Sequence, residues 1–239
     1  MIDSGRNRID IAEEKTDRGE QAREALLQAA IEEFGARGLE GARIRAIASR
    51  AGQNVAAVSY YFRSKEGLYI AIAETMTARL RAQMAPLFAE ADKLKQCGAV
   101  DDTECVAMIC ELLEGMMRLL LSERHLAPLM MTMMREQMQP TGAFDIYYEQ
   151  MMKPLHGSIA HFLAKICGFA PDSPETVTRT HALIGQIVIF RVGQETLRRR
   201  ANWTTIGEKE RETAYAAIRA SVRATLRGYL YEKELSNNE

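Results

Sequence analysis

The chain has few of the residues that interrupt helices. It contains 6 prolines and 16 glycines in 239 residues, while alanine, leucine, methionine, arginine and glutamate, which favour helices, are abundant. No stretch approaches the roughly 18 unbroken apolar residues that a membrane span requires. The longest apolar run, residues 182–190, already contains Gly185 and Gln186. The composition therefore predicts an all-α protein without a membrane partner.

Cysteine is scarce too, and the N-terminus lacks a targeting signal. The four cysteines, at positions 97, 105, 110 and 167, have no spacing typical of a zinc site. We therefore expect reduced thiols rather than a disulfide framework. The first ten residues are polar and of mixed charge, without the apolar core of a secretory signal. These features favour a cytoplasmic protein.

Motifs of catalysis and metal binding are also missing. The sequence has no G-x-S-x-G, no glycine-rich phosphate loop, no H-E-x-x-H and no paired-carboxylate arrangement. His156 and His161 are five residues apart, not the three or four that bring two ligands onto one helical face. We predict no enzyme, no cofactor and no metal site. A helical small-molecule-binding protein or enzyme without specific DNA binding is the alternative interpretation.

One strongly basic segment stands out against this background. Residues 43–65 contain five basic residues and no acidic one, a formal charge of +5, whereas the whole chain carries −1 and the remainder therefore −6. A short basic segment on a mildly acidic body indicates contact with phosphate groups in one place.

Apolar spacing in and around this segment predicts short helices. The first helix should end at Gly35 and Gly38, and the second, from Ile44, should end at Gly52. Asn54 is a suitable N-cap for a third helix over 55–62. Two short helices joined by a tight glycine turn are typical of a helix-turn-helix, whose second helix enters the major groove.

The side chains of this pair suit DNA. Arginine and lysine engage phosphates, arginine reads guanine, amides pair with adenine, and tyrosine hydroxyls donate to phosphates. An ordinary helical surface with scattered arginines is the other interpretation. The candidates on chemistry alone are Arg43, Arg45, Arg50, Gln53, Asn54, Tyr60, Tyr61, Arg63 and Lys65.

The run I-R-A-I-A-S-R-A-G-Q-N-V-A-A-V-S-Y-Y-F-R-S-K-E-G-L-Y closely resembles the N-terminal signature of the TetR family of transcriptional regulators, over residues 20–69. The resemblance implies an all-helical homodimer that represses genes by binding a pseudo-palindromic double-stranded DNA operator, and releases it when a small-molecule effector binds. It also implies base contacts from the helix that begins at Ile44 and from the helix over 55–62, the reading helix, which enters the major groove. Phosphate contacts are implied beside them. The implied base contacts are Arg45, Val55, Ala57, Ser59 and Tyr60, and the implied phosphate contacts are Tyr61 and Lys65.

The sequence departs from the family pattern at three places. Arg43 replaces the usual capping threonine, Gln53-Asn54 replaces Val-Ser, and Ala56 replaces a frequent glycine. The turn A-G-Q-N-x-A-A and residues 181–196 are similar to the CecR (YbiH-like) branch, whose members are linked to transport and antibiotic-sensitivity genes. The departures imply an operator different from that of a typical member.

The rest of the chain predicts a larger helical domain. We expect a disordered tail over 1–18, the helix-turn-helix domain over 19–65, and an effector-binding and dimerisation domain over 66–239. Its helices should cover about 65–95, 101–121, 123–138, 142–168, 174–199 and 208–232, and the last two should form the homodimer interface.

Methionine is concentrated in the middle of this domain. Ten of the thirteen methionines fall between Met108 and Met152, and flexible methionines suit a pocket that adapts to varied apolar molecules. Plain core filling is the alternative. The candidate ligand-binding residues are Met116, Met117, Met130, Met134, Tyr147, Met151 and His156.

Overall fold

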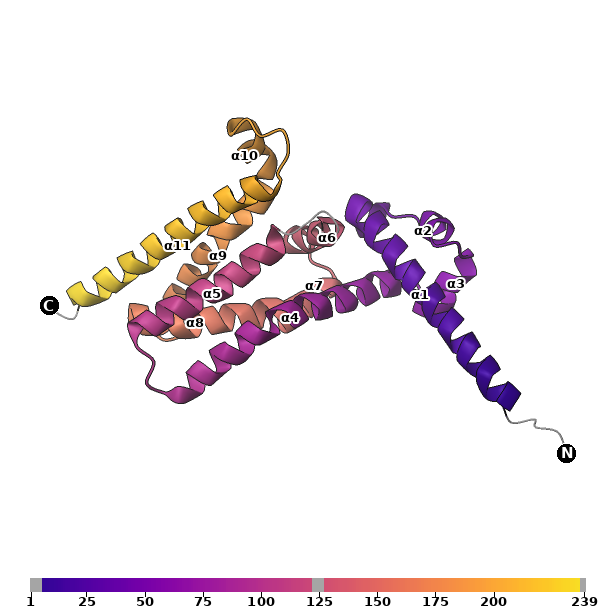
Figure 1. Ribbon diagram of the computed structural model, residues 1–239, viewed down its shortest axis with the longest axis horizontal. Helices are drawn as coiled ribbons and strands as arrows, with labels where there is room; N and C mark the ends of the chain where they lie inside the picture. The colour runs from indigo at the N-terminus through magenta and orange to yellow at the C-terminus, as the bar shows by residue number, and fades with distance from the viewer. Residues whose placement is uncertain (1–5, 122–126, 237–239) are drawn as a thin grey trace. The chain divides into compact units, whose positions relative to one another are not determined.

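The structure is a computed structural model that describes residues 6–121 and 127–236, without the side chains of residues 6–17, 127 and 129. Within these ranges the chain is helical and has no strand, which confirms the all-α prediction. No described helix is long and apolar enough to cross a membrane. The elements, labelled in Figure 1, are α1 Arg6–Gly41, α2 Ile44–Arg50, α3 Val55–Phe62, α4 Lys65–Cys97, α5 Asp102–Leu120, α6 Ala127–Met138, α7 Gly142–Tyr147, η2 Tyr148–Met152, α8 Lys153–Cys167, α9 Pro174–Val192, α10 Gln194–Arg200 and α11 Glu208–Ser236.

The chain forms two compact units. The head unit comprises Met1–Ala78 and Arg124–Tyr147, and the body unit comprises Arg79–Glu123 and Tyr148–Glu239. The head unit thus extends past the boundary expected at residue 65 and includes α6 and α7, while α4 contributes residues to both units. Of the expected tail, residues 1–5 lie outside the described part, and α1 begins at Arg6.

Helix α1 continues past the glycine at which we expected it to end. A Cβ on Gly35 would lie 2.6 Å from Cβ of Pro128, so this glycine allows α6 to pack closely against α1. The break comes at Gly38, whose φ of 70° and ψ of 178° are non-helical. Gly35 therefore serves helix packing, and Gly38 alone makes the kink.

Two long helices of the expected body are interrupted. The predicted helix over 142–168 is divided into α7, the π-helical turn η2 and α8, which has a proline in its first turn. Proline lacks the N–H that a continuous helix would need there. The predicted helix over 174–199 breaks at Gly193 into α9 and α10.

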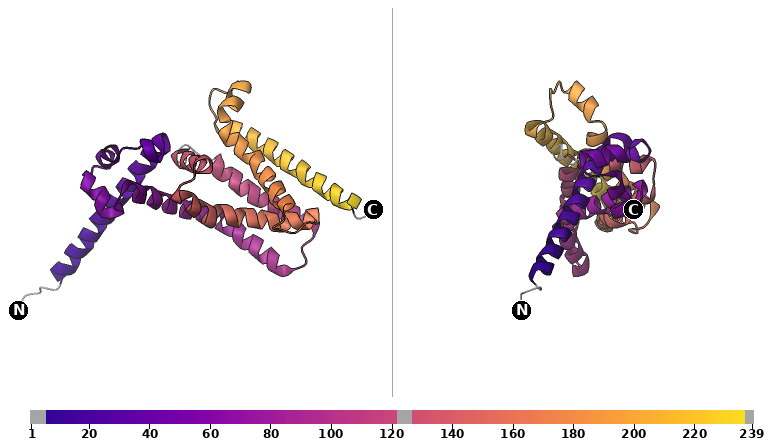
Figure 2. Two further views of the ribbon diagram at one scale, coloured as in Figure 1. Left: turned by 180° about the vertical axis from the view of Figure 1, so that it is seen from behind. Right: turned by 90° about the vertical axis from the view of Figure 1, so that its right-hand side faces the viewer.

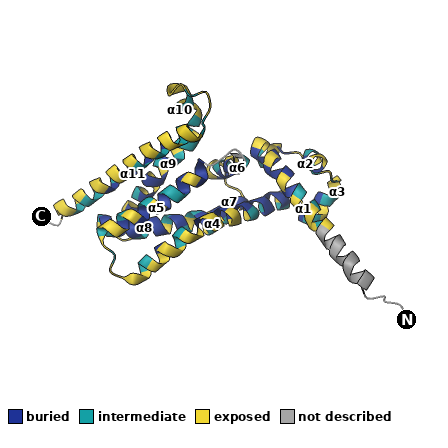
Figure 3. Cartoon of the chain, in the orientation of Figure 1, coloured by how far each residue is buried: buried dark blue, intermediate teal, exposed yellow. Residues whose placement is uncertain are grey.

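The core of the body unit lies among α5, α8, α9 and α11, which pack against one another. Figure 3 shows long buried stretches on α5 and α8 and an exposed outer face on α11. In α5 the buried residues recur at helical spacing, among them Ile109, Leu112 and Met116. An Asp101–Glu104 capping box, with both reciprocal hydrogen bonds present, begins this helix.

Candidate nucleic-acid interface

The turn between α2 and α3 has the backbone that the sequence predicts. Gly52 has φ of 65°, a conformation that glycine adopts at little cost. The backbone N–H of Gln53 donates to the carbonyl of Ala48 at 2.8 Å, which closes the turn. Asn54 Oδ1 accepts from the N–H of Ala57 at 2.8 Å, which confirms the predicted N-cap.

Helix α3 presents one face to solvent and buries the other. Val58 and Phe62 are buried and fix the helix to the head unit, whereas 46% of Val55 and 81% of Tyr60 are exposed. Exposed side chains on a helix that is fixed by its other face are available to contact a partner. The geometry therefore suits insertion of this face into a groove.

The structure brings the ten candidate DNA-binding residues together in the head unit. All lie on α2, the residues just before it, the turn, α3 or the first residue of α4. Arg43, Arg45, Asn54, Val55, Ser59 and Tyr60 are exposed, and Gln53, Ala57, Tyr61 and Lys65 are partly exposed.

A buried glutamate supports the start of α2, where the family's capping threonine is missing. Arg43 gives α2 no side-chain cap, but its backbone N–H donates to Glu33 Oε1 at 3.3 Å. Glu33 is 4% exposed and forms an ion pair with Arg37 at 3.1 Å. Arg50 pairs with Glu32 at 3.3 Å, so this cation is partly neutralised within the chain. Sequence reasoning missed this role of Glu33 because Arg43 lies ten residues further along the chain.

Lys65 has a structural role beside the phosphate contact implied by the resemblance. Its Nζ donates to the carbonyl of Glu40 at 2.9 Å, near the C-terminal end of α1, where carbonyls lack helical partners. An ammonium group has three donors, so this bond leaves two for other acceptors.

The connection between α3 and α4 is tight. Arg63 has φ of 69° and ψ of −46°, and the N–H of Ser64 donates to the carbonyl of Phe62 at 2.8 Å. These are the features of a γ-turn, which strains a residue other than glycine. Ser64 Oγ then accepts from the N–H of Gly67 at 3.0 Å, so Ser64 caps the start of α4. The reading helix α3 is thus joined to α4 by a short connection that is held by hydrogen bonds.

Helix α6 holds the head unit together through two adjacent charged residues. Arg135 donates to the carbonyls of Phe34 at 2.8 Å and Ala36 at 3.0 Å. Glu136 is 2% exposed and accepts from the Tyr69 hydroxyl at 2.7 Å. It also accepts from the backbone N–H of Thr141 at 2.9 Å. Burial and the hydrogen bond to Glu136 raise the pKa of Tyr69 well above its ordinary value.

The candidate ligand-binding residues are divided between the two units. Met130, Met134 and Tyr147 belong to the head unit, and the other four belong to the body unit. Most are buried, with Met134 and His156 half-buried. The hydroxyl of Tyr147 is buried without a hydrogen-bond partner in the described residues.

His156 lies close to a histidine from another helix. Its ring centroid is 5.8 Å from that of His181 on α9. Burial, and then the neighbouring His181, lower the pKa of His156. The described residues contain no group of three or more side chains that could hold a metal ion.

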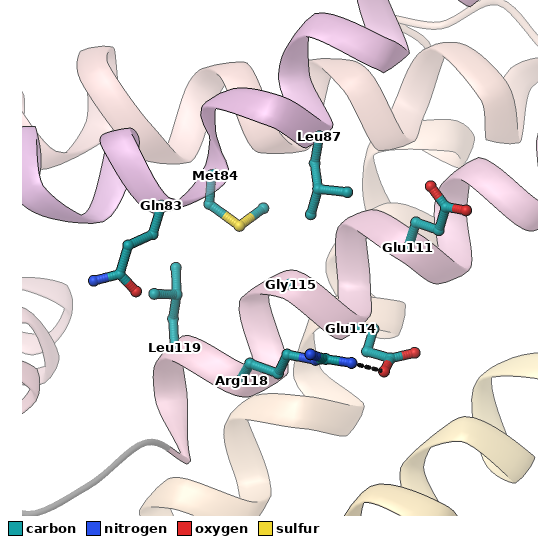
Figure 4. Close-up of a pocket in the computed structure, with 8 residues that line it drawn as sticks. All are labelled: Gln83, Met84, Leu87, Glu111, Glu114, Gly115, Arg118 and Leu119. Atoms are coloured by element: carbon teal, nitrogen blue, oxygen red, sulfur yellow. Dashed lines mark hydrogen bonds and ion pairs between the residues drawn. The ribbon is translucent and has the colours of Figure 1, made fainter.

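The body unit does contain a cavity, between α4 and α5, of about 400 Å³. Figure 4 shows Met84 and Leu87 directed from α4 towards α5, with Gln83 and Glu111 at opposite ends. The full lining is Gln83, Met84, Leu87, Glu111, Glu114, Gly115, Arg118 and Leu119. None of the seven candidate ligand residues lines it.

Helices α9 and α11, which Figure 2 shows in two views, pack against each other. Gln186 joins them, donating to Thr225 Oγ1 at 3.0 Å and accepting from Ser221 Oγ at 3.0 Å. On α11, from which we expect part of the homodimer interface, the apolar residues Ala214, Ile218, Val222 and Leu226 are buried within the chain. The face left exposed on α9 and α11 carries Ala182, Gly185, Ile189, Val192, Ala217, Ala220, Ala224 and Gly228.

Comparison with known proteins decides the family. Residues 26–72 match the family described as bacterial regulatory proteins, tetR family. Residues 107–229 match the C-terminal domain of the HTH-type transcriptional dual regulator CecR. The chain is 35% identical to the HTH-type transcriptional dual regulator CecR of Shigella flexneri over 213 residues, 89% of this chain and 95% of that protein. The chain belongs to the TetR family of transcriptional regulators.

Solved structures of transcriptional regulators share this fold. A putative TetR-family regulator from Mesorhizobium loti MAFF303099 is 17% identical, with a TM-score of 0.54, over 88% of this chain and 97% of that one. The hemolysin II transcriptional regulator HlyIIR is 21% identical, with a TM-score of 0.53, over 76% of this chain and 93% of that one. As a TetR-family member with a CecR-type C-terminal domain, the protein is a transcriptional regulator and not an enzyme.

Proposed function

We propose that this regulator is a homodimeric repressor that binds a pseudo-palindromic operator and releases it when an apolar or amphipathic small molecule binds. The observation that carries the proposal is the exposed face of α3, with Tyr60 81% exposed on a helix fixed by buried Val58 and Phe62. A rigid helix with exposed polar and aromatic side chains suits major-groove contact.

The proposed contacts follow the sequence prediction. Arg45 and the exposed residues of α3 would read bases, Gln53 and Asn54 would adjust the preferred operator, and Arg43, Tyr61 and Lys65 would meet phosphates. Since Lys65 also binds the carbonyl of Glu40, its phosphate contact would help to fix the end of α1.

The exposed face of α9 and α11 supports a homodimer. Its alanines and glycines, Ala182, Gly185, Ala220, Ala224 and Gly228 among them, permit close approach of helices in a four-helix arrangement. A two-fold dimer would present two α3 helices to half-sites about 34–36 Å apart or a multiple of this. We still propose that α9 and α11 form the homodimer interface. The contact would be made by their exposed residues and not by the apolar residues of α11 that are buried within the chain.

We propose that helix α4 transmits the effect of effector binding in the body unit to the DNA-binding helices of the head unit. Its residues up to Ala78 belong to the head unit, and from Arg79 they belong to the body unit. An effector acts only if it binds the two states of the dimer with different affinity. Releasing the operator about 100-fold would need a coupling free energy of about 2.7 kcal/mol, within the usual range for allosteric proteins.

The regulated genes are proposed from the relative. The protein of Shigella flexneri is named a dual regulator, so activation at some promoters is compatible with the proposal. We propose transport or antibiotic-sensitivity genes as targets, in line with the resemblance to the CecR branch.

The test is a search for a specific operator. The purified protein should select a pseudo-palindromic site upstream of its own gene or its neighbours, measured by fluorescence anisotropy against random DNA of the same length. Arg45→Ala should weaken operator binding by about 1–3 kcal/mol and binding to random DNA much less. Arg200→Ala, an exposed arginine on α10 of the body unit, is the matched control. Equal affinity of the wild type for operator candidates and random DNA would refute the proposal.

A further inference from the structure

The cavity between α4 and α5 carries one carboxylate that the chain itself does not neutralise. Within the described residues, Glu111 makes no hydrogen bond or ion pair. The other acidic residue of the lining, Glu114, pairs with Arg118 at 2.8 Å and with Arg219 at 3.7 Å. The lining therefore has a formal charge of −1, located at Glu111.

The wall opposite this charge is apolar. Met84 is 1% exposed and Leu119 is 7% exposed, and both line the cavity together with Leu87. At the other end from Glu111, the amide of Gln83 makes no hydrogen bond to any described residue. The cavity thus has an apolar middle part, with a carboxylate at one end and an amide at the other.

The space between the helices is maintained at Gly115. A Cβ there would lie 2.5 Å from Cδ1 of Leu87 and 2.9 Å from Sδ of Met84, so glycine lets both side chains extend over α5. Methionine adapts its shape to different apolar neighbours. A volume of about 400 Å³ lies within the range of about 300–1,000 Å³ found for small-molecule sites.

We propose that this cavity binds a cationic amphipathic small molecule, whose positive group pairs with Glu111 and whose apolar body packs on Met84, Leu87 and Leu119. A positive ligand charge fits because the unpaired group in the lining is negative. An anionic ligand would meet the uncompensated carboxylate of Glu111, while the one basic residue of the lining, Arg118, is already paired with Glu114.

The inference rests on the proposed function in one respect, the role of the bound cation as effector. Gln83, Met84 and Leu87 belong to α4, which supplies residues to both units. Pro86 lies among them inside the helix and removes one backbone hydrogen bond. A ligand bound here would therefore contact α4 where proline removes one backbone hydrogen bond.

The test uses three probes with one apolar body: 4-phenylbutylamine, 4-phenylbutanol and 4-phenylbutanoate. Isothermal titration calorimetry on the full-length protein at pH 7 should show the amine binding about fivefold more tightly than the alcohol, as expected for an ion pair with the exposed Glu111, and the acid binding most weakly. Glu111→Gln should remove the preference for the amine over the alcohol. Asp172→Asn, which removes the same charge from an exposed residue in the loop before α9, should retain it.

The outcomes separate the site from its regulatory role. Affinities of the three probes within twofold of one another, no saturable binding of the amine, or a Glu111→Gln variant that behaves like Asp172→Asn would each overturn the cation site. Operator affinity is then measured with and without the amine. If the amine binds with the expected preference and leaves operator affinity unchanged, the site stands and the effector role is contradicted. If no operator exists, the proposed function fails, while the calorimetric test of the cavity still holds.

Discussion

The tight connection between α3 and α4 leads to a prediction about Gly67. A Cβ at this position would overlap the carbonyl oxygen of Phe62, a backbone atom held in the γ-turn at Arg63 by the bond from Ser64. Since the obstructing atom belongs to the backbone, rotation of a side chain cannot relieve the contact. Gly67→Ala should therefore displace the start of α4 relative to α3.

The magnitude follows from two opposing effects. Alanine is favoured over glycine inside a helix by up to about 1 kcal/mol, whereas overpacking costs about 1–3 kcal/mol. Because the obstructing atom belongs to the backbone, the upper part of the range for overpacking applies. We therefore expect Gly67→Ala to lower the free energy of unfolding by about 2 kcal/mol. In Gly157→Ala, on α8, the new Cβ would meet nothing within 4 Å, and stability should rise by about 0.4–1 kcal/mol.

The assay compares these two substitutions. Urea denaturation followed by circular dichroism reports on both units, while fluorescence of Trp203, the single tryptophan, reports on the body unit. Gly67→Ala should lower the urea concentration at the midpoint of the circular-dichroism transition and weaken operator binding. Gly157→Ala should do neither. If Gly67→Ala is as stable as the wild type, the junction relaxes freely, and the rigid link between reading helix and α4 is refuted.

Three further predictions concern groups in the head and body units. Tyr69→Phe removes the 2.7 Å bond to buried Glu136 and should lower the free energy of unfolding by about 1.5–3 kcal/mol; an unchanged urea midpoint would contradict the role of this bond. Glu33→Gln removes the charge that accepts the hydrogen bond from the backbone of Arg43. It should lower the free energy of unfolding by a similar amount and weaken operator binding. Glu20→Gln, at an exposed position of α1, should change neither. Because burial lowers the pKa of His156, the folded state binds fewer protons there than the unfolded chain. Its contribution to stability should be complete above about pH 6.5 and should be lost as the pH falls; thermal melting of His156→Gln should show a weaker pH dependence than the wild type.

The helix-turn-helix could be predicted from the sequence because its determinants are local. Gly52, the Asn54 cap and the apolar spacing of α3 act within a few residues of one another, and the bounds of α3 are those expected. The cap from Ser64 to Gly67 is equally local.

The supports of that motif could not be predicted, because they join distant residues. Arg135 reaches carbonyls about a hundred positions earlier, and Gly35 packs on Pro128. The orientation of α11 was ambiguous for another reason. Both of its faces carry small or apolar residues, so periodicity alone did not show which stripe, Ala214 to Leu226 or Ala217 to Gly228, is buried in the chain.

The ion pair between Arg50 and Glu32 bears on how the complex would tolerate salt. Glu32 partly neutralises Arg50, whereas the other four cations of the basic segment have no ion pair in the described residues, since Lys65 donates to a neutral carbonyl and keeps its charge. Eight such groups in the proposed dimer would release counterions with a logarithmic slope of about −7, against about −9 if all ten cations met phosphates. A fourfold rise in salt would then weaken binding about 10⁴-fold rather than about 10⁵-fold. The ion pair within the chain would thus make operator occupancy less sensitive to ionic strength.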